Sequence, residues 1–186
     1  MSYQTCIAIT RDQLKGIMPN CRHLEYLSHI NEAMRDWSIN TCARKAAFLA
    51  QMAYESNQFF YMESPWSGQE FEGRGNLGNT QMGDGMRFKG RGPLQLIGRA
   101  KYKAAGDALR LDLVNNPGQV KDPDVGFQTS AWLWAKQGLN QVADRKSLTD
   151  FRRITDAVAA RKSATTDRNV REKYWSTAKS VLNCLP

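Results

Sequence analysis

Apolar residues recur at three- and four-residue intervals along most of the chain, and one long glycine-rich stretch, residues 56–92, interrupts this spacing. Such intervals place apolar side chains on one face of a helix, whereas the alternation typical of strands is scarce. The pattern predicts an all-α, mainly helical fold around a long loop region that holds at most a short hairpin. A loop of this length inside a compact domain is usually functional or disordered, and its aromatic and charged residues favour function.

The apolar spacing also gives approximate positions for the helices. With 186 residues, of which 41% are hydrophobic, the chain can bury one core, so we expect a single domain over residues 1–186. Alanines on the helix that ends at Glu55 form a small-residue face that lets a neighbour approach closely. We expect helices after Thr10 and over about 24–37, 40–55, 94–109, 124–134, 148–160 and 166–182, with a turn at 138–140.

The chain is strongly basic, with a net charge of +8 and a pI near 9.5. This charge favours an anionic partner, although excess Lys and Arg can also simply solvate a surface. The basic residues are spread along the chain, so we expect no nucleic-acid partner. No apolar run is long enough to span a membrane, and the N-terminus has no signal peptide pattern, so we expect no membrane insertion. Separately, we expect a monomer.

Four cysteines are present, Cys6, Cys21, Cys42 and Cys184, and none are spaced as a CxxC pair. With only two histidines to join them, a zinc site is not expected, and no other metal or organic cofactor is implied. Two alternatives stay open. The cysteines form disulfides in an exported protein, with three possible connectivities, or they are buried free thiols in a reducing cytoplasm.

Two glutamates are placed to do acid and base chemistry together. Glu55 lies at the C-terminal end of an expected helix, and Glu72 lies in the glycine-rich stretch that follows. A loop that folds back can bring one carboxyl to face the other across a cleft, as glycoside hydrolysis requires. Taken alone, Glu55 is more often an ordinary surface glutamate.

Three segments carry a specific resemblance. They are residues 48–56 (FLAQMAYES), residues 72–85, which contain EGRGNLGNTQ and GDG, and residues 88–96 (FKGRGPLQL). These segments resemble glycoside hydrolase family 19, the group of plant-type chitinases and many phage endolysins. The resemblance extends more loosely through residues 98–102, 130–134, 138–140 and 167–168, and covers roughly residues 10–182.

The resemblance implies a lysozyme-like helical domain whose glycine-rich region forms a substrate cleft. It implies that Glu55 is the general acid and Glu72 the general base of an inverting mechanism, with the carboxyls roughly 6.5 to 9.5 Å apart. Glu70 is the alternative base. We expect partial burial against Tyr54 or Phe59 to raise the pKa of Glu55, and Glu72 to stay ionised.

Candidate substrate contacts follow from the same motifs. Gln95 matches a substrate-contacting glutamine of the family, and its amide suits an N-acetyl group or a sugar hydroxyl. Aromatic side chains such as Trp66 could stack on sugars, although aromatics are more often core or loop anchors. The complete set of candidates is Gln95, Tyr102, Arg91, Asn79, Thr80 and Tyr61, with Arg74, Arg91 and Arg168 as candidate counter-charges.

The chain departs from the family pattern at several positions. Tyr54 replaces the usual His before the acid, and Ile97 replaces a Ser or Thr that would hold water, a contact that Asn79 or Thr80 could supply instead. Lys101 stands where Asn is usual, and the Asn-Gly-Gly segment of the family appears as residues 155–157 (TDA), which are helical in character.

The leading interpretation is a peptidoglycan hydrolase of lysozyme type, acting at the bacterial cell wall, in the periplasm or outside the cell. One alternative is a chitinase that cuts β-1,4-linked N-acetylglucosamine. The other is a non-catalytic cell-wall glycan-binding protein derived from such an enzyme, which the changes at Ile97 and Thr155 motivate.

Overall fold

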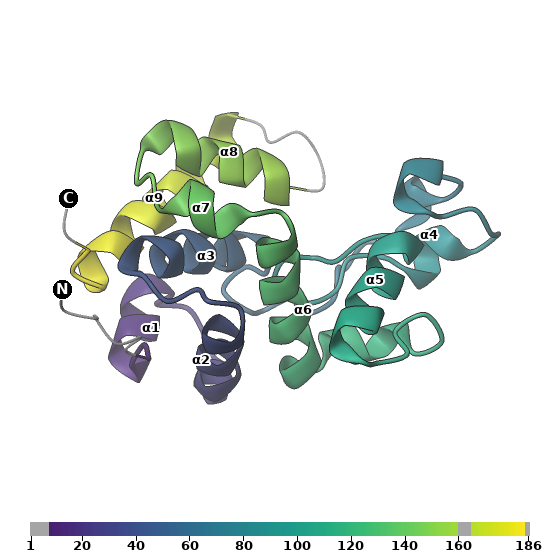
Figure 1. The fold of residues 1–186 in the computed structure, drawn as a ribbon, viewed down its shortest axis with the longest axis horizontal. Helices are drawn as coiled ribbons and strands as arrows, with labels where there is room; N and C mark the ends of the chain where they lie inside the picture. The colour runs from purple at the N-terminus through teal and green to yellow at the C-terminus, as the bar shows by residue number, and fades with distance from the viewer. Residues whose placement is uncertain (1–7, 160–164, 185–186) are drawn as a thin grey trace.

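The structure is a computed structural model that describes residues 8–159 and 165–184, and it confirms the all-α fold class. No helix in these ranges combines the length and apolarity needed to cross a membrane. The helices, drawn in Figure 1, are α1 (Arg11–Ile17), α2 (Leu27–Asp36), α3 (Cys42–Glu55), α4 (Asp84–Arg87), α5 (Arg99–Leu109), α6 (Pro123–Lys136), α7 (Leu139–Ala143), α8 (Leu148–Val158) and α9 (Thr165–Val181). Short 3-10 turns lie at η1 (Leu24–Tyr26), η2 (Gln69–Phe71), η3 (Gly75–Leu77) and η4 (Pro117–Lys121).

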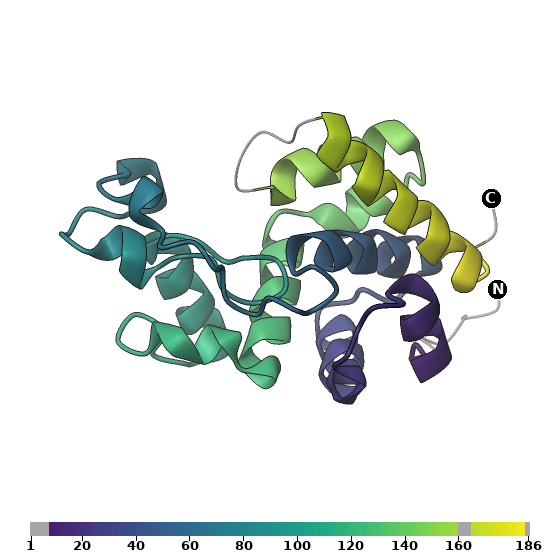
Figure 2. The same cartoon turned by 180° about the vertical axis from the view of Figure 1, so that it is seen from behind.

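Helix α3 is the centre of the larger helical group. Residues 45–53 are all buried, so α3 is enclosed on every face rather than on one stripe. Its alanines at 46, 50 and 53 have no exposed surface, and α9 packs along the helix more extensively than any other described element. The predicted small-residue face is therefore used for a close helix–helix contact. Figures 1 and 2 show α3 surrounded by α1, α7, α8 and α9.

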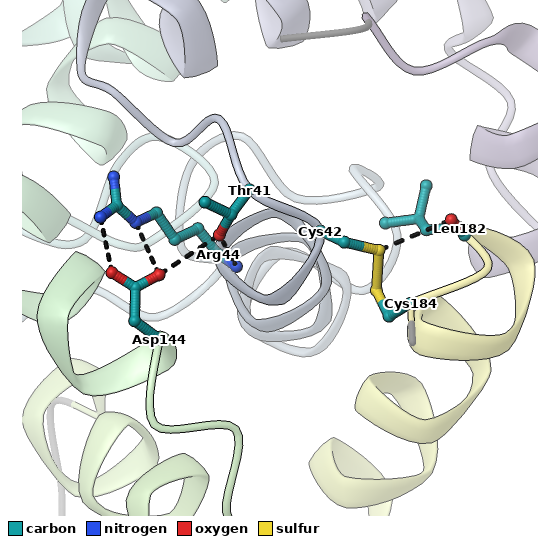
Figure 3. Close-up of a disulfide and its surroundings, with 6 residues drawn as sticks. All are labelled: Thr41, Cys42, Arg44, Asp144, Leu182 and Cys184. Atoms are coloured by element: carbon teal, nitrogen blue, oxygen red, sulfur yellow. Dashed lines mark hydrogen bonds and ion pairs between the residues drawn. A yellow bond between two sulfur atoms is a disulfide. The ribbon is translucent and has the colours of Figure 1, made fainter. Parts of the chain in front are cut away.

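Two cross-links fix the N-terminal end of α3, and Figure 3 shows both. A disulfide joins Cys42 to Cys184, just beyond α9. Arg44 forms a two-pronged ion pair with Asp144, with N–O distances of 2.9 and 2.6 Å. For these two cysteines the structure decides in favour of a disulfide. Cys21 is a buried free thiol, and Cys6 lies outside the described residues.

Replacing Cys42 and Cys184 together by Ser is expected to lower the free energy of unfolding by about 2 to 5 kcal/mol, because the bond closes a long loop in the unfolded chain. Urea denaturation of both proteins, with and without reductant, measures the difference. Reductant should destabilise the wild type and leave the double variant unchanged. Equal unfolding midpoints for the oxidised wild type and the variant would contradict this assignment.

The glycine-rich stretch, with α4 and α5, forms a smaller group on the other side of α6 (Figures 1 and 2). Within the described ranges its strand-like pairing is limited to two isolated antiparallel bridges, between Glu63 and Arg91 and between Arg91 and Leu96. The chain passes very close to itself here: a Cβ added at Gly85 would lie 2.6 Å from the backbone nitrogen of Glu72. Only glycine fits that approach.

The start of α5 and the turn near Gly138 differ from the sequence prediction. The helix expected from residue 94 begins at Arg99, because Gly92, Gln95 and Gly98 take left-handed φ angles of 74°, 52° and 93° that a helix cannot contain. Of the turn expected at 138–140, Gly138 is a turn residue with a φ of 67°, whereas Leu139 already begins the short helix α7. The helical character predicted for residues 155–157 is confirmed, since they belong to α8.

Candidate active site

A cleft of about 580 Å³ lies beside the C-terminal end of α3. Its lining combines that helix end with the loop that follows it, the turn before α5 and the first part of α9. The lining residues are Tyr54, Glu55, Asn57, Tyr61, Ser64, Pro65, Trp66, Glu70, Phe71, Gly90, Gln95, Ile97, Ala159, Asp167 and Arg171. A largely buried carboxyl, several aromatic rings and an amide therefore line one hollow, a combination typical of ligand sites.

A tight left-handed turn ends α3 directly after Glu55. Ser56 donates its hydroxyl to the Met52 carbonyl at 2.6 Å and accepts from the Phe59 N–H at 2.8 Å. Asn57, Gln58 and Phe59 all have φ near 50° to 70°, which is costly for residues with side chains. Because Phe59 is fully buried, packing stabilises this turn and holds Glu55 at the cleft wall.

Glu55 is a largely buried carboxyl whose side chain is only 12% exposed. Burial raises its pKa, because an ionised carboxylate loses hydration there, while the charge and hydrogen bond of Arg171 oppose that rise. Asp167 adds a smaller contribution in the same direction as burial. The net upward direction agrees with the expectation for a general acid, which must hold its proton at the working pH.

Arg171 is the main partner of Glu55, and the sequence analysis missed it. Its guanidinium is buried, donates one hydrogen bond to Glu55 and another of 2.5 Å to Gln51, and lies 3.9 Å from the centroid of the Tyr54 ring. A signal was present in the sequence, since Arg171 lies four residues before Trp175 on the buried stripe of α9. A charge on such a stripe needs a partner.

Tyr54, the residue that replaces the usual His, is bonded to Asp167. Burial and the hydrogen bond to the Asp167 carboxylate raise the pKa of the Tyr54 hydroxyl to about 12. Tyr54 is therefore neutral at any ordinary pH. Its ring supports the Arg171 guanidinium while its hydroxyl holds the start of α9 against the end of α3.

Glu72, the predicted base, is not among the described residues that line the cleft. Its two carboxylate oxygens accept the backbone N–H groups of Gly83 and Gly85, at 2.6 and 2.7 Å. Those groups belong to the N-terminal end of the short helix α4. The structure thus gives Glu72 a capping position in the loop region, because free N–H groups at a helix start attract a carboxylate.

Two other carboxylates of the loop are further candidates for the base. Glu70, the alternative base of the sequence analysis, is exposed and lines the cleft. Glu63, which is not among the residues predicted from the sequence, directly precedes the lining residue Ser64 and, like Glu72, is not itself a lining residue. Burial opposes ionisation of Glu63, but Arg91 at 2.6 Å and Lys89 at 3.0 Å outweigh it and lower its pKa. Glu63 is therefore held as an anion.

Of the predicted substrate contacts, Gln95 and Tyr61 line the cleft. The amide nitrogen of Gln95 donates a hydrogen bond to the Gly92 carbonyl at 3.0 Å. Its amide oxygen can then accept a hydrogen bond from another group. Tyr61 is 36% exposed, and the neighbouring Trp66 is 73% exposed, so both rings present open faces. Ile97 also lies on the wall, where the resemblance implies a hydroxyl.

The remaining predicted contacts lie elsewhere. Tyr102 is fully buried and donates its hydroxyl to the Lys89 carbonyl at 2.7 Å, so it supports the loop rather than a sugar. Arg91 is not among the lining residues, and its guanidinium forms an ion pair with Glu63 at 2.6 Å. Asn79 is buried; its amide nitrogen donates to the Phe71 carbonyl, and its amide oxygen accepts from the Arg99 N–H. Thr80 is exposed and is not among the lining residues.

The other candidate counter-charges are not among the lining residues either. Arg168 pairs with Asp156 at 2.9 Å, and Arg74 packs over the ring of Phe71. Within the described ranges, no group of three or more His, Cys, Asp or Glu side chains could hold a metal ion.

Comparison with known families gives one matching model, described as chitinase class I, over residues 38–150. Among named relatives, the acidic 27 kDa endochitinase of Solanum lycopersicum is 42% identical over 92 residues, which is 48% of this chain and 35% of that protein. Chitinase 11 of Oryza sativa subsp. japonica is 56% identical over 48 residues, 25% of this chain and 19% of that protein. The chain thus spans about a third of the tomato relative and less of the rice relative.

Comparison with solved structures covers nearly the whole chain. Chitinase C from Streptomyces griseus HUT6037 superposes with a TM-score of 0.78 at 20% identity, over 98% of this chain and 96% of that one. The family GH19, class IV chitinase from Zea mays superposes with a TM-score of 0.73 at 18% identity, over 96% and 94%. At these identities the likeness concerns the fold, and it agrees with the lysozyme-like helical architecture implied by the motifs.

Proposed function

The chain belongs to the chitinase class I family, glycoside hydrolase family 19, and from this premise we propose that it hydrolyses β-1,4 bonds between N-acetylated amino sugars in a chitin-type polymer. The observation that carries the proposal is the buried carboxyl of Glu55 in a cleft whose neighbouring loop holds the ionised carboxylate of Glu63. Relatives named as endochitinases support chitin as the substrate. The expected preference for peptidoglycan has no specific support from these relatives.

The proposed mechanism divides the two proton transfers between Glu55 and Glu63. Both carboxyls start from an ordinary pKa of 4.5, and their surroundings move them in opposite directions. An acid and a base that work as a pair require such a divergence, which supports these two roles. Glu55 protonates the leaving glycosidic oxygen, and Glu63 removes a proton from the attacking water, so that the anomeric configuration inverts. We assign the base to Glu63 in place of Glu72.

The cleft supports recognition of an N-acetylated sugar chain. The Gln95 amide can bond an acetamido group or a hydroxyl, and the open faces of Tyr61 and Trp66 can stack on sugar rings. Ile97 places an apolar side chain where a water-holding hydroxyl is usual. Losing one such hydrogen bond costs about 1 to 3 kcal/mol in the transition state, which slows the reaction without stopping it.

Product analysis tests the proposal directly. Purified protein is incubated with chitin oligomers, and NMR determines the anomeric form of the initial products before they mutarotate. Inversion at a β-linkage should give α-anomers. A β-anomer would exclude the inverting mechanism. Tight binding without new reducing ends would favour the non-catalytic glycan-binding alternative instead.

Peptidoglycan is a second candidate substrate, which the net charge of +8 favours because the bacterial wall is anionic. Purified wall is tested beside chitin oligomers, and cleavage of wall alone would select it. The Cys42–Cys184 disulfide supports action in an oxidising compartment, such as the periplasm or the outside of the cell.

A further inference from the structure

We propose that Gln51 and Thr155 are positioning residues, which act through Arg171 to fix the guanidinium against the Glu55 carboxyl. This inference rests on the proposed function for its catalytic meaning. Its structural basis is a continuous, buried hydrogen-bonded chain that crosses three helices, from Thr155 on α8 through Gln51 on α3 to Arg171 on α9.

The direction of every hydrogen bond in this chain is determined by chemistry. An arginine side chain has only donors, so the Gln51 amide must turn its oxygen toward Arg171, at 2.5 Å. The Gln51 NH₂ group then faces away and needs an acceptor, which is the Thr155 hydroxyl oxygen at 2.8 Å. A residue without an acceptor at position 155 would leave this amide nitrogen unpaired.

Burial makes the arrangement rigid. Gln51 has no exposed surface, Thr155 is 1% exposed and Arg171 is 3% exposed, so water cannot replace a lost partner. The Tyr54 ring closes the remaining face of the guanidinium at 3.9 Å. Arg171 is therefore enclosed by Gln51, Glu55 and Tyr54, and the bond from Gln51 limits how far it can move from the carboxyl.

The other charged or titratable groups near Glu55 are acidic or neutral, so they do not favour its ionised form as Arg171 does. Asp167 on α9 disfavours ionisation of Glu55, and Tyr54 on α3 is neutral because its pKa is about 12. Glu70 on the cleft wall and Glu63, the proposed base, are carboxyls of the neighbouring loop. Arg171 is the cation that lowers the pKa of Glu55 against its burial, so any loosening of Arg171 should raise that pKa further.

The test compares two buried helical threonines. Thr155→Val removes the acceptor for Gln51, and Thr129→Val makes the same change at a 1% exposed site on α6, which is not among the residues that line the cleft. Activity falls when Glu55 loses its proton, so Thr155→Val should move the alkaline limb of the pH profile upward by roughly 0.5 to 1 unit. Thr155→Ser keeps the hydroxyl and should restore the wild-type limb, and Thr129→Val should not move it.

A second variant and a second readout keep the inference separate from the proposed function. Gln51→Glu introduces a carboxylate that shares the Arg171 charge, so it should also raise the pKa of Glu55. NMR titration of isotope-labelled glutamate carboxyls, assigned with Glu55→Gln, follows Glu55 without any substrate. Identical Glu55 titrations in Thr155→Val, Gln51→Glu and Thr129→Val would overturn the inference. A wild type inactive on chitin and on cell wall would overturn only the proposed function.

Discussion

Glu55→Gln is expected to lower kcat on chitin oligomers by about 10²- to 10⁴-fold, the usual contribution of a general acid. The carboxamide has the same shape as the carboxyl, and its oxygen can still accept the hydrogen bond from Arg171. It cannot give a proton to the leaving oxygen. We therefore expect an intact fold, nearly unchanged substrate binding and a loss confined to the chemical step.

The matched control is Glu72→Gln, which makes the same change at an exposed glutamate outside the cleft lining. It removes one of the two acceptors for the Gly83 and Gly85 N–H groups, so it should reduce stability by about 1 kcal/mol and leave kcat within a few-fold of the wild type. Initial rates of reducing-end release and thermal unfolding measure both effects. Wild-type turnover by Glu55→Gln would remove Glu55 from the mechanism.

The helices that follow an apolar spacing could be predicted from the sequence because their positions depend on local pattern. The helix that ends at Glu55 was expected over about 40–55 and is Cys42–Glu55, and residues 155–157 are helical as expected. The predicted start of α5 was wrong because three residues before it have positive φ angles. The pattern of polar and apolar residues does not reveal such angles. Positive φ at a glycine is common, but at Gln95 it depends on the surrounding loop.

Pairings between distant residues could not be predicted. Arg171 meets Glu55 only because α9 packs along α3, and no local pattern in either helix specifies that partner. The role of Glu72 depends on where Gly83 and Gly85 direct their N–H groups, which is a property of the folded loop. Tyr102 lies on a motif that suggested a substrate contact, yet its hydroxyl is used inside the core.

A signal for Glu63 was available but weak. It is the first carboxylate after Glu55 in the chain, and two cations, Lys89 and Arg91, stand in the motif at residues 88–96. The antiparallel bridge between Glu63 and Arg91 joins these segments, and the ion pair between the two side chains favours the ionised form of Glu63. The number of residues that separate each loop glutamate from Glu55 does not show which of them is the base.

Glu63→Gln is expected to lower kcat by about 10²- to 10⁴-fold, because the attacking water then lacks a base. In the wild type, activity should fall as the pH drops through the lowered pKa of Glu63, and it should fall again as the pH rises through the raised pKa of Glu55. The acidic limb should disappear in Glu63→Gln. Rates across the pH range, measured on chitin oligomers, check both limbs.

Loss of the ion pairs with Lys89 and Arg91 could also disturb the loop, so the variant needs a chemical control. Azide attacks a glycosidic carbon without giving up a proton and therefore needs no base. Added azide should restore turnover in Glu63→Gln and form a glycosyl azide, whereas a merely distorted cleft would not respond. Glu70→Gln is the matched variant on the cleft wall. If azide restores turnover in Glu70→Gln but not in Glu63→Gln, Glu70 is the base. Azide compensates for the loss of a proton acceptor but not for the loss of an ion pair.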